Sequence, residues 1–444
     1  MRTSLAPPNT TDHEITRRLT RPDVCDYRLA ANQTDGESVV VSSHELRLTV
    51  MAKTGSTEWL VEVLRNGDSK LGKLLNEYEL VKDDTTQIGA GQGMLSKVFN
   101  HVLQLSNGET HSVIVKIPGG YFEENQDDAN EHKKPLPYRA HNRECKFFND
   151  FPHLNEYIQA PYVYLAVPYD DPKRDPVVVM ESLVGRTKVG SVSDSFTSEQ
   201  LFNIAKDIAK FQSYFLTMAD QSYVDKYPMD IVDEVDDIKF FKEHFDQIGD
   251  YGDGSLKPLV SELSPILFNL KVWHYTTHKA YKSLGLPPVM CNDDTWVNNI
   301  LWNLNEDGSI SNHVGGYIDW QFAHAGCLPI DLVCSLVLCV KPSLQREIQY
   351  KVLQVYYDTL KKEVEKKGGK IDFNLDQVKK CYQANFCGIV ARDLGFQPLS
   401  LKQGSSKFDD WTMKAKQEEM FIKCKLMLEQ TAEFVKTLPK KLLE

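Results

Sequence analysis

The chain has 444 residues, enough for two domains or lobes that each bury a core of their own. Hydrophobic residues make up 41% and charged residues 25%, which is ordinary for a soluble globular protein. The formal net charge of −11 argues against a general nucleic-acid binder and against binding to an anionic membrane surface. No apolar run approaches the ~20 residues of a transmembrane helix.

The N-terminal region lacks the apolar core of a secretory signal. Residues 1–52 mix Pro, Thr, Asn, Arg and Asp without lasting periodicity, and we interpret them as a disordered or loosely attached tail. A transit peptide is a weaker alternative. Nine cysteines without a Cys-x-x-Cys pair favour reduced thiols and no zinc site. Together these features predict a cytoplasmic protein.

A glycine-rich stretch, Gly89-Ala90-Gly91-Gln92-Gly93, follows two short predicted helices over 56–78 and lies between two strand patterns. Glycines at every second position let the backbone approach an anion closely, so that its N–H groups can cradle phosphates. A flexible hairpin turn is the commoner explanation of such a stretch taken alone. The second strand pattern, over 98–105, and the hairpin turn at Asn107-Gly108 favour a phosphate-binding loop.

Lys116 follows three β-branched residues in a predicted strand over 111–117. A lysine at the end of a buried strand needs a partner for its charge, unless its side chain reaches solvent. With the glycine-rich stretch upstream, we interpret Lys116 as a lysine that binds the α- and β-phosphates of ATP. Two more predicted strands, over 162–167 and 177–180, precede Glu181-Ser182-Leu183. This arrangement suits an inter-lobe strand whose backbone could hydrogen-bond an adenine.

From residue 184 the pattern turns helical. Thr197 and Gln200 predict a capping box, and the helix after them has one apolar face, formed by Leu201, Ile204, Ile208, Phe211 and Phe215. A further helix is predicted by Leu263, Ile266, Leu270 and Trp273, and others over 332–340, 348–360, 374–390 and 408–437. We interpret Asp331 as a residue that caps a helix. The lone histidines His274, His278, His313 and His324 are interpreted as structural or surface residues. The aromatic residues of the last helices are interpreted as core: Phe386, Phe396, Trp411 and Phe421. The alternative for the aromatic residues is a substrate cleft.

The stretch 288–331 places Asp294, Asn299 and Asp319 close together in the sequence. A short strand is predicted from Asn299, a turn at Glu306-Asp307-Gly308, and a returning strand over 316–318. Such a hairpin would bring Asn299 beside Asp319. An amide and a carboxylate on rigid strands can hold a divalent metal ion, and Asp294 can accept a proton. This is the layout of a phosphoryl-transfer site.

Three motifs of this stretch are Asp294-Thr295-Trp296-Val297-Asn298-Asn299-Ile300-Leu301, Ile318-Asp319-Trp320-Gln321 and Gly326-Cys327-Leu328-Pro329-Ile330-Asp331-Leu332. They resemble the motifs of the CHK-kinase-like (ecdysteroid kinase-like) family of the choline kinase and aminoglycoside phosphotransferase superfamily. The resemblance implies that Asp294 is the catalytic base and that Asn299 and Asp319 bind Mg²⁺. It also implies an ATP site formed by Gly89, Gly91, Gly93, Ser96, Lys116, Glu144, Glu181 and Leu183. Glu144 lies in a predicted helix over 138–148, from which it would fix Lys116.

Two residues depart from the family pattern, since Asn292 and Asp293 stand where the family has His and Gly. Asp293 and Asn298 also share the five-residue spacing of Asp294 and Asn299, but Trp296 fits the motif only in the second register. We expect the carboxylate of Asp293 to add negative charge near the phosphates. A pseudokinase that binds nucleotide or a small ligand without turnover therefore stays an alternative.

The sequence predicts an α+β, two-lobed protein-kinase-like fold with a small β-rich N-lobe (53–183) and a large helical C-lobe (184–444). Its predicted activity is a phosphotransferase reaction, in which the γ-phosphoryl group of ATP passes, with Mg²⁺, to a hydroxyl group of a small organic molecule. The resemblance implies a steroid- or lipid-like acceptor. A protein kinase is the less consistent alternative, because the His-Arg-Asp and Asp-Phe-Gly triplets are missing. The oligomeric state is not indicated.

Overall fold

The computed structural model describes residues 54–67, 69–89, 95–119, 135–171, 173–192, 194–232, 235–403 and 408–444, all within one compact unit, Ala52–Glu444. The predicted tail over 1–52 lies outside the described residues, as do Gly91 and Gly93 of the glycine-rich stretch. None of the described helices combines the length and the apolar character that a bilayer crossing requires.

The first lobe contains a five-stranded antiparallel sheet in the order β1-β2-β3-β5-β4. Its strands are β1 (Leu80–Ile88), β2 (Ser96–Leu105), β3 (Thr110–Pro118), β4 (Val163–Val167) and β5 (Val177–Glu181). Because side chains alternate along a strand, Val113 and Val115 point to one face of β3 and Ile114 and Lys116 to the other. The valines pack in a hydrophobic cluster with the two predicted helices, α1 (Thr57–Asn66) and α2 (Lys70–Glu77).

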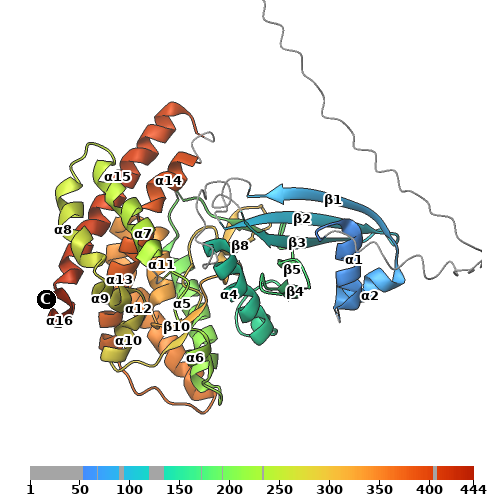
Figure 1. The fold of residues 1–444 in the computed structure, drawn as a ribbon, viewed down its shortest axis with the longest axis horizontal. Coiled ribbons are helices and arrows are strands. Elements are labelled where there is room, and N and C mark those ends of the chain that lie inside the picture. Colours follow the sequence, from blue (N-terminus) through green and yellow to red (C-terminus); the bar gives the residue numbers. More distant parts are fainter. Residues whose placement is uncertain are drawn as a thin grey trace, which may run out of the picture. The chain divides into compact units, whose positions relative to one another are not determined.

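One long helix of this lobe, α4 (Leu136–Asp150), lies between the sheet and the helical lobe (Figure 1). It buries Ala140, Cys145, Phe147 and Phe148, and it carries Glu144 on the same buried side. A short 3₁₀ turn, Leu154–Glu156, then leads to β4. The helix is therefore packed firmly enough to hold a charged side chain in a fixed place.

The second lobe is helical and is built on α5 (Ser198–Thr217). The predicted capping box at Thr197 and Gln200 is present, and all five residues of the predicted apolar face are buried. The remaining helices are α6 (Tyr223–Lys226), α7 (Val235–Gln247), α8 (Lys257–Leu267), α9 (Leu270–His274), α10 (Ala280–Ser283), α11 (Ile330–Leu338), α12 (Pro342–Lys366), α13 (Leu375–Asp393), α14 (Phe396–Gln403), α15 (Asp410–Val435) and α16 (Lys440–Leu443), with a 3₁₀ turn at Ile248–Asp250 and a π-helical segment at Tyr275–Lys279.

The single helix predicted from Leu263 to Trp273 is wrong, because the chain forms two helices there. The first, α8, ends at Leu267, and Asn269 begins α9 by accepting a hydrogen bond from the backbone N–H of Lys271 at 3.0 Å. An asparagine side chain that caps a new helix competes with continuation of the old one. The apolar spacing on both sides of the break is the same, so periodicity alone does not reveal it.

The hairpin predicted in the 288–331 stretch is present as β8 (Ile300–Leu304) and β9 (Ile310–Tyr317), with Gly308 at φ +78° in its turn. Strand β6 (Thr187–Val189) pairs with the other edge of β8. A second small sheet pairs β7 (Val289–Cys291) with β10 (His324–Gly326). These two small sheets hold the loops that carry Asp294 and Asp319.

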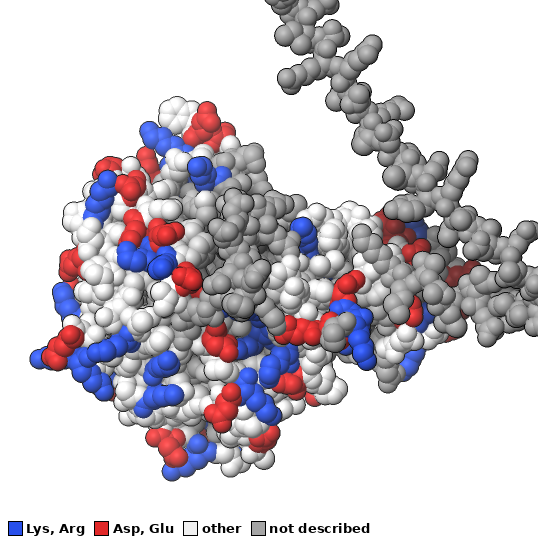
Figure 2. Space-filling view, in the orientation of Figure 1, with Lys and Arg blue, Asp and Glu red and all other residues white. Residues whose placement is uncertain are grey.

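The predicted fold class is confirmed: the chain has a β-rich N-lobe and a helical C-lobe in a protein-kinase-like arrangement (Figure 1). On the face shown in Figure 2, the described lysine and arginine side chains alternate with aspartate and glutamate across the helical lobe. The negative net charge is therefore not gathered into one patch on this face.

Candidate active site

A cavity of about 610 Å³ lies between the two lobes. The N-lobe lines it with Ile88, Val98, Ile114, Lys116 and Met180, and the C-lobe with Asp294, Asn299, Asp319, Gln321, Arg392, Asp393 and Phe396, among others. Most of the wall is apolar, and its charged side chains come largely from the 288–331 stretch and from the end of α13. A cavity of this kind is where a small-molecule site is expected.

Lys116 lies at the centre of the charged group. Its Nζ donates to Glu144 Oε2 at 2.7 Å and to Asp319 Oδ1 at 2.7 Å. Burial lowers the pKa of Lys116, but the carboxylates of Asp319 and Glu144 outweigh this effect and raise the pKa above its usual value. The lysine therefore stays charged at neutral pH, and it links the two lobes.

Glu144 holds the position of this lysine from α4. It is fully buried, and its second oxygen, Oε1, accepts a hydrogen bond from the backbone N–H of Trp320 at 3.2 Å. The Trp320 ring stacks on Phe147 of the same helix, with 4.6 Å between the ring centroids. Glu144 thus contacts both the lysine and the loop that carries Asp319, as its predicted role requires.

Asp294 and Asn299 are in direct contact. The Nδ2 of Asn299 donates to Asp294 Oδ2 at 2.8 Å and to the Asp294 carbonyl oxygen at 3.0 Å. Because the amide nitrogen is used in this way, the amide oxygen is the atom of Asn299 that can ligate a cation. Burial raises the pKa of Asp294 well above its usual value, and the negative charge of Asp319 raises it further. A carboxylate in this state is a stronger base than an exposed one.

Asp319 lies in a left-handed backbone conformation, with φ +63°. The loop is held because Ile318 N–H donates to the Asn299 carbonyl at 3.0 Å and Asn292 Nδ2 donates to the Asp319 carbonyl at 3.2 Å. The structure thus brings Asn299 beside the loop of Asp319, as the hairpin predicted. This hydrogen bond from the Asn292 side chain braces the loop that carries Asp319.

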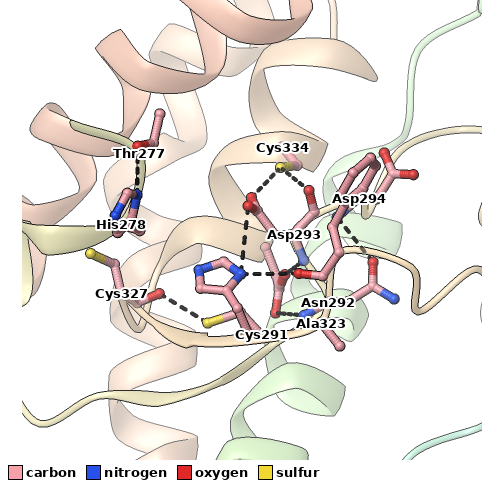
Figure 3. A network of polar contacts seen from close by, with 12 residues as sticks. Thr277, His278, Cys291, Asn292, Asp293, Asp294, Ala323, Cys327 and Cys334 are labelled. Carbon is pink, nitrogen blue, oxygen red and sulfur yellow. Dashed lines mark hydrogen bonds and ion pairs between the residues drawn. The ribbon is translucent and has the colours of Figure 1, made fainter. Parts of the chain in front are cut away.

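The expectation that Asp293 adds negative charge near the phosphates is wrong. Asp293 is fully buried and does not line the cavity, and its carboxylate pairs with Arg392 at 2.6 Å and 3.1 Å. The thiol of Cys334 also lies against Asp293 (Figure 3). Successive side chains of an irregular loop point in different directions, so the two adjacent aspartates have different surroundings. Of these two aspartates, Asp294 is the one that lines the cavity. This agrees with the motif alignment that pairs Asp294 with Asn299, which Trp296 favoured.

Asp331 lies in the first turn of α11, but its side chain forms no capping hydrogen bond with that helix, which corrects the sequence interpretation. It is buried, and its carboxylate accepts the backbone N–H of Asp293 at 2.7 Å and that of Asn292 at 3.3 Å. Burial raises the pKa of Asp331 to about 7. A carboxylate directly before the largely apolar run 332–340 could have signalled this role, because it is buried with that run.

Other predicted binding residues lie around the N-lobe side of the cavity. Gly89, at φ +64°, and Ser96, the first residue of β2, both line it. Glu181, the last residue of β5, and Leu183, just after that strand, line it as well. The Glu181 side chain accepts a hydrogen bond from Arg186 at 2.6 Å, so it is turned toward that residue.

The C-lobe side of the cavity includes residues that the sequence left unassigned. Phe396, interpreted as core, lines the cavity and stacks on His244 with 4.4 Å between ring centroids. Phe386 is buried without lining it, and Trp411 is 83% exposed. Arg392 and Asp393 were not singled out at all. An arginine that directly follows the apolar run 389–391 on a helix was the available signal for a buried charge.

The described side chains can be searched for groups that could bind a metal ion. Among the residues that the structure describes, no three or more His, Cys, Asp or Glu side chains form a group that could hold a metal ion. The eight described cysteines are all free and buried. Asn299 and Asp319 form a two-residue set of oxygen donors. Mg²⁺ commonly uses one or two carboxylates together with substrate phosphates and water, so such a pair fits that ion.

The two lobes, the cavity between them and the ion pairs of Lys116 with Glu144 and Asp319 define a protein with a kinase-like fold. A family model, DUF1679, described as "Uncharacterized oxidoreductase dhs-27", matches residues 111–436. The match covers more than half of the 444 residues, and the chain belongs to this family.

Two curated proteins of Caenorhabditis elegans are similar in sequence. "Uncharacterized oxidoreductase dhs-27" is 25% identical over 347 residues, which is 74% of this chain and 40% of that protein. "Uncharacterized kinase-like protein D1044.1" is 29% identical over 118 residues, 27% of this chain and 29% of that protein. The chain thus spans less than half of either relative. Among solved structures, a Plasmodium vivax ethanolamine kinase is similar, with a TM-score of 0.41, 12% identity, and coverage of 86% of this chain and 89% of that one.

Proposed function

We propose that this protein is a phosphotransferase that moves the γ-phosphoryl group of ATP to a hydroxyl group of a small organic molecule. The observation that carries the proposal is that Lys116, Asp294, Asn299 and Asp319 all line the same cavity between the lobes. These are the residue types that phosphoryl transfer needs: a cation for phosphate oxygens, a base, and two oxygen donors. The motifs around them support membership of the CHK-kinase-like branch, and one curated relative is named kinase-like.

Lys116 would bind the phosphates of ATP. Its charge is maintained by Glu144 and Asp319, and Glu144 holds it from a packed helix. Gly89 and Ser96 line the same side of the cavity, so their backbone and hydroxyl groups would contact the phosphates with it. The apolar residues Ile88, Val98 and Met180 would then cover the base, next to the backbone of Glu181 and Leu183.

Asn299 and Asp319 would hold Mg²⁺ together with the phosphate oxygens. Bound Mg²⁺ supplies positive charge that stabilises the negative charge of the transferred phosphoryl group. Asp319 contributes a carboxylate and Asn299 its amide oxygen, and both belong to loops fixed by backbone hydrogen bonds. The protein's part is to keep these donors in one place before ATP arrives.

Asp294 would accept the proton of the attacking hydroxyl group. It lies on the cavity wall, and hydrogen bonds from Asn299 at 2.8 Å and Gln321 at 3.5 Å orient its carboxylate. Its raised pKa makes it a better proton acceptor than an exposed aspartate. The same two donors would keep one oxygen engaged while the other faces the acceptor.

The acceptor would be largely apolar. Beyond Asp294 the cavity wall continues with the aromatic residues Phe240, Phe241, Trp296 and Phe396, and with Val232, Leu338 and Leu399. Such a surface favours a ring system or an aliphatic chain over a heavily charged sugar. A steroid- or lipid-like alcohol, which the family resemblance implies, fits this lining.

An oxidoreductase function is not proposed for these residues. The word oxidoreductase comes from the name of the relative dhs-27, and the match with this chain covers only 40% of that protein. Every strand pair in the described sheets is antiparallel. Rossmann-type oxidoreductases bind their dinucleotide on a mostly parallel sheet, so the described residues do not supply that site.

A second candidate is a nucleotide- or ligand-binding protein without turnover. The observation that favours it is the ion pair between Lys116 and Asp319, which engages an oxygen that the metal ion would need. The test incubates the purified chain with Mg-ATP and a panel of hydroxylated lipids and steroids, and it detects a phosphorylated product by mass. Product that disappears in Asp294→Asn supports the kinase. A thermal shift with Mg-ATP and no product from any acceptor supports the binding protein.

A further inference from the structure

The residue just before the proposed base has an unfavourable backbone conformation. Asp293 has φ +61°, a left-handed backbone angle that residues other than glycine adopt rarely. The family pattern has glycine at this position, where the conformation is free of strain. Such a conformation persists in a non-glycine residue only when the surrounding structure holds it in place.

Three sets of contacts hold Asp293. Its N–H donates to Asp331 at 2.7 Å, and its carbonyl oxygen accepts from Arg392 Nη2 at 2.9 Å. Its carboxylate takes two more hydrogen bonds from the same guanidinium, at 2.6 Å and 3.1 Å. Arg392 is itself buried on α13, where Asp393 fixes its Nε at 3.1 Å. One side chain thus supplies three of the hydrogen bonds that hold this residue.

The direction of Asp294 depends on this turn. A change of backbone angle at one residue rotates everything that follows, and Asp294 is the next residue. Asp294 is held at its N–H by Asn292 Oδ1 at 3.0 Å, and Asn292 belongs to the same turn. Arg392 also lines the cavity beside Asp294, so it acts at the point where the loop meets the acceptor side.

We propose that Arg392 is a positioning residue for the reaction: its salt bridge with Asp293 fixes the left-handed turn that aims Asp294 into the cavity. This inference rests on the proposed phosphotransferase function. The pair replaces the glycine of the family pattern, because it achieves by contacts what glycine achieves by its own freedom. The Asp293–Arg392 pair therefore compensates for the missing glycine and does not mark a lost active site.

The first test compares Arg392→Met with the double variant Asp293→Gly/Arg392→Met in the full chain. Removing Arg392 leaves the Asp293 carboxylate buried without its partner, so we expect kcat to fall by about tenfold or more while KM for ATP changes less than about twofold. Glycine at 293 no longer needs the salt bridge. The double variant should therefore recover kcat to within about threefold of the wild type.

A matched control is Arg139→Met. Arg139 also forms a two-pronged ion pair with an aspartate, Asp237, at 2.8 Å and 3.2 Å, but it joins α4 to α7 away from the catalytic loop. The Arg139→Met variant should have a lower midpoint of thermal unfolding and an unchanged kcat. If Arg392→Met behaves like this control, or if the double variant is no more active than Arg392→Met, the positioning role is refuted.

Hydrogen exchange separates this inference from the proposed function. Backbone exchange over residues 288–298 should rise in Arg392→Met and return toward the wild-type rate in the double variant, whether or not an acceptor is known. If the wild type transfers no phosphoryl group yet exchange follows this pattern, the proposed function fails and the role of Arg392 in holding the turn stands. Unchanged exchange in Arg392→Met overturns the inference even if the wild type is an active kinase.

Discussion

Lys116 and Asp319 are 203 positions apart in the chain, and their side chains form an ion pair of 2.7 Å. The pair joins β3 of the N-lobe to the loop after β9 of the C-lobe. It places the proposed phosphate-binding cation beside the proposed metal ligand before any nucleotide is bound. Both side chains therefore already lie on the cavity wall, and Mg²⁺ would have to displace Lys116 from this oxygen of Asp319 when ATP enters.

Asp319→Asn tests the metal-ligand role. The amide removes the negative charge but keeps the size of the side chain, so we expect kcat to fall by about a hundredfold or more. Lys116 retains Glu144, so the free energy of unfolding should change by about 1 kcal/mol or less. Steady-state kinetics and urea denaturation measure the two effects. Asp307→Asn, in the exposed turn of the hairpin, is the control, and turnover equal to wild type in Asp319→Asn would remove Asp319 from the mechanism.

Asp331→Ala tests how the catalytic loop is held. The substitution leaves the N–H groups of Asn292 and Asp293 buried without their acceptor, which costs about 1–3 kcal/mol. Asp331→Asn keeps one acceptor oxygen and should cost less. We expect both a lower urea midpoint and a lower kcat for the alanine variant, with the asparagine variant between it and the wild type. Equal stability of all three proteins would show that the Asp331 carboxylate does not hold the loop.

Phe396→Ala tests the acceptor side of the cavity. Phe396 lines the cavity and contacts His244 and Phe240, at ring distances of 4.4 Å and 5.7 Å. Loss of its apolar surface should raise KM for the acceptor by about tenfold, equivalent to ~1.4 kcal/mol, and leave KM for ATP unchanged. Trp411→Ala is the control, because that ring is 83% exposed. An equal change in both KM values would place Phe396 outside the acceptor site.

The parts of the fold that the sequence predicted rest on local patterns. The capping box at Thr197, the buried face of α5 and the β8–β9 hairpin each depend on residues a few positions apart. Lys116 was also predictable, because it directly follows three β-branched residues of a strand and a glycine-rich stretch lies upstream. Such features need no knowledge of distant contacts.

The parts that the sequence could not predict depend on distant partners. Asp293 and Arg392 are 99 positions apart, and nothing near Asp293 shows that its charge is neutralised. Asp331 was interpreted as a cap because its contacts lie 38 and 39 positions away, in the catalytic loop. A buried charge next to an apolar run shows that a partner must exist, but it does not say which.

The buried His278 should make the protein less stable in acid. Burial, together with the neighbouring His324 and Lys279, lowers its pKa to about 2, whereas an unfolded histidine titrates near ~6.5. Between these two values the unfolded chain binds the extra proton, so stability is lost as pH falls below ~6.5, by about 1.4 kcal/mol per pH unit. The stability difference between wild type and His278→Gln should therefore shrink by about 1 kcal/mol between pH 7 and pH 5.5. A difference that does not change with pH would contradict this.

Gly388→Ala tests the contact between α13 and the π-helical segment Tyr275–Lys279. A Cβ atom at 388 would lie 2.5 Å from the carbonyl oxygen of Thr276, and that backbone is held by a 2.8 Å hydrogen bond from Asn385. We expect a loss of about 1–3 kcal/mol in urea denaturation, larger than the gain of ~1 kcal/mol in helix propensity. Because Arg392 follows one turn later on α13, a displaced helix should also lower kcat. Gly67→Ala is the control, since its nearest atom would lie at 3.6 Å; equal stability of both variants would refute the close contact.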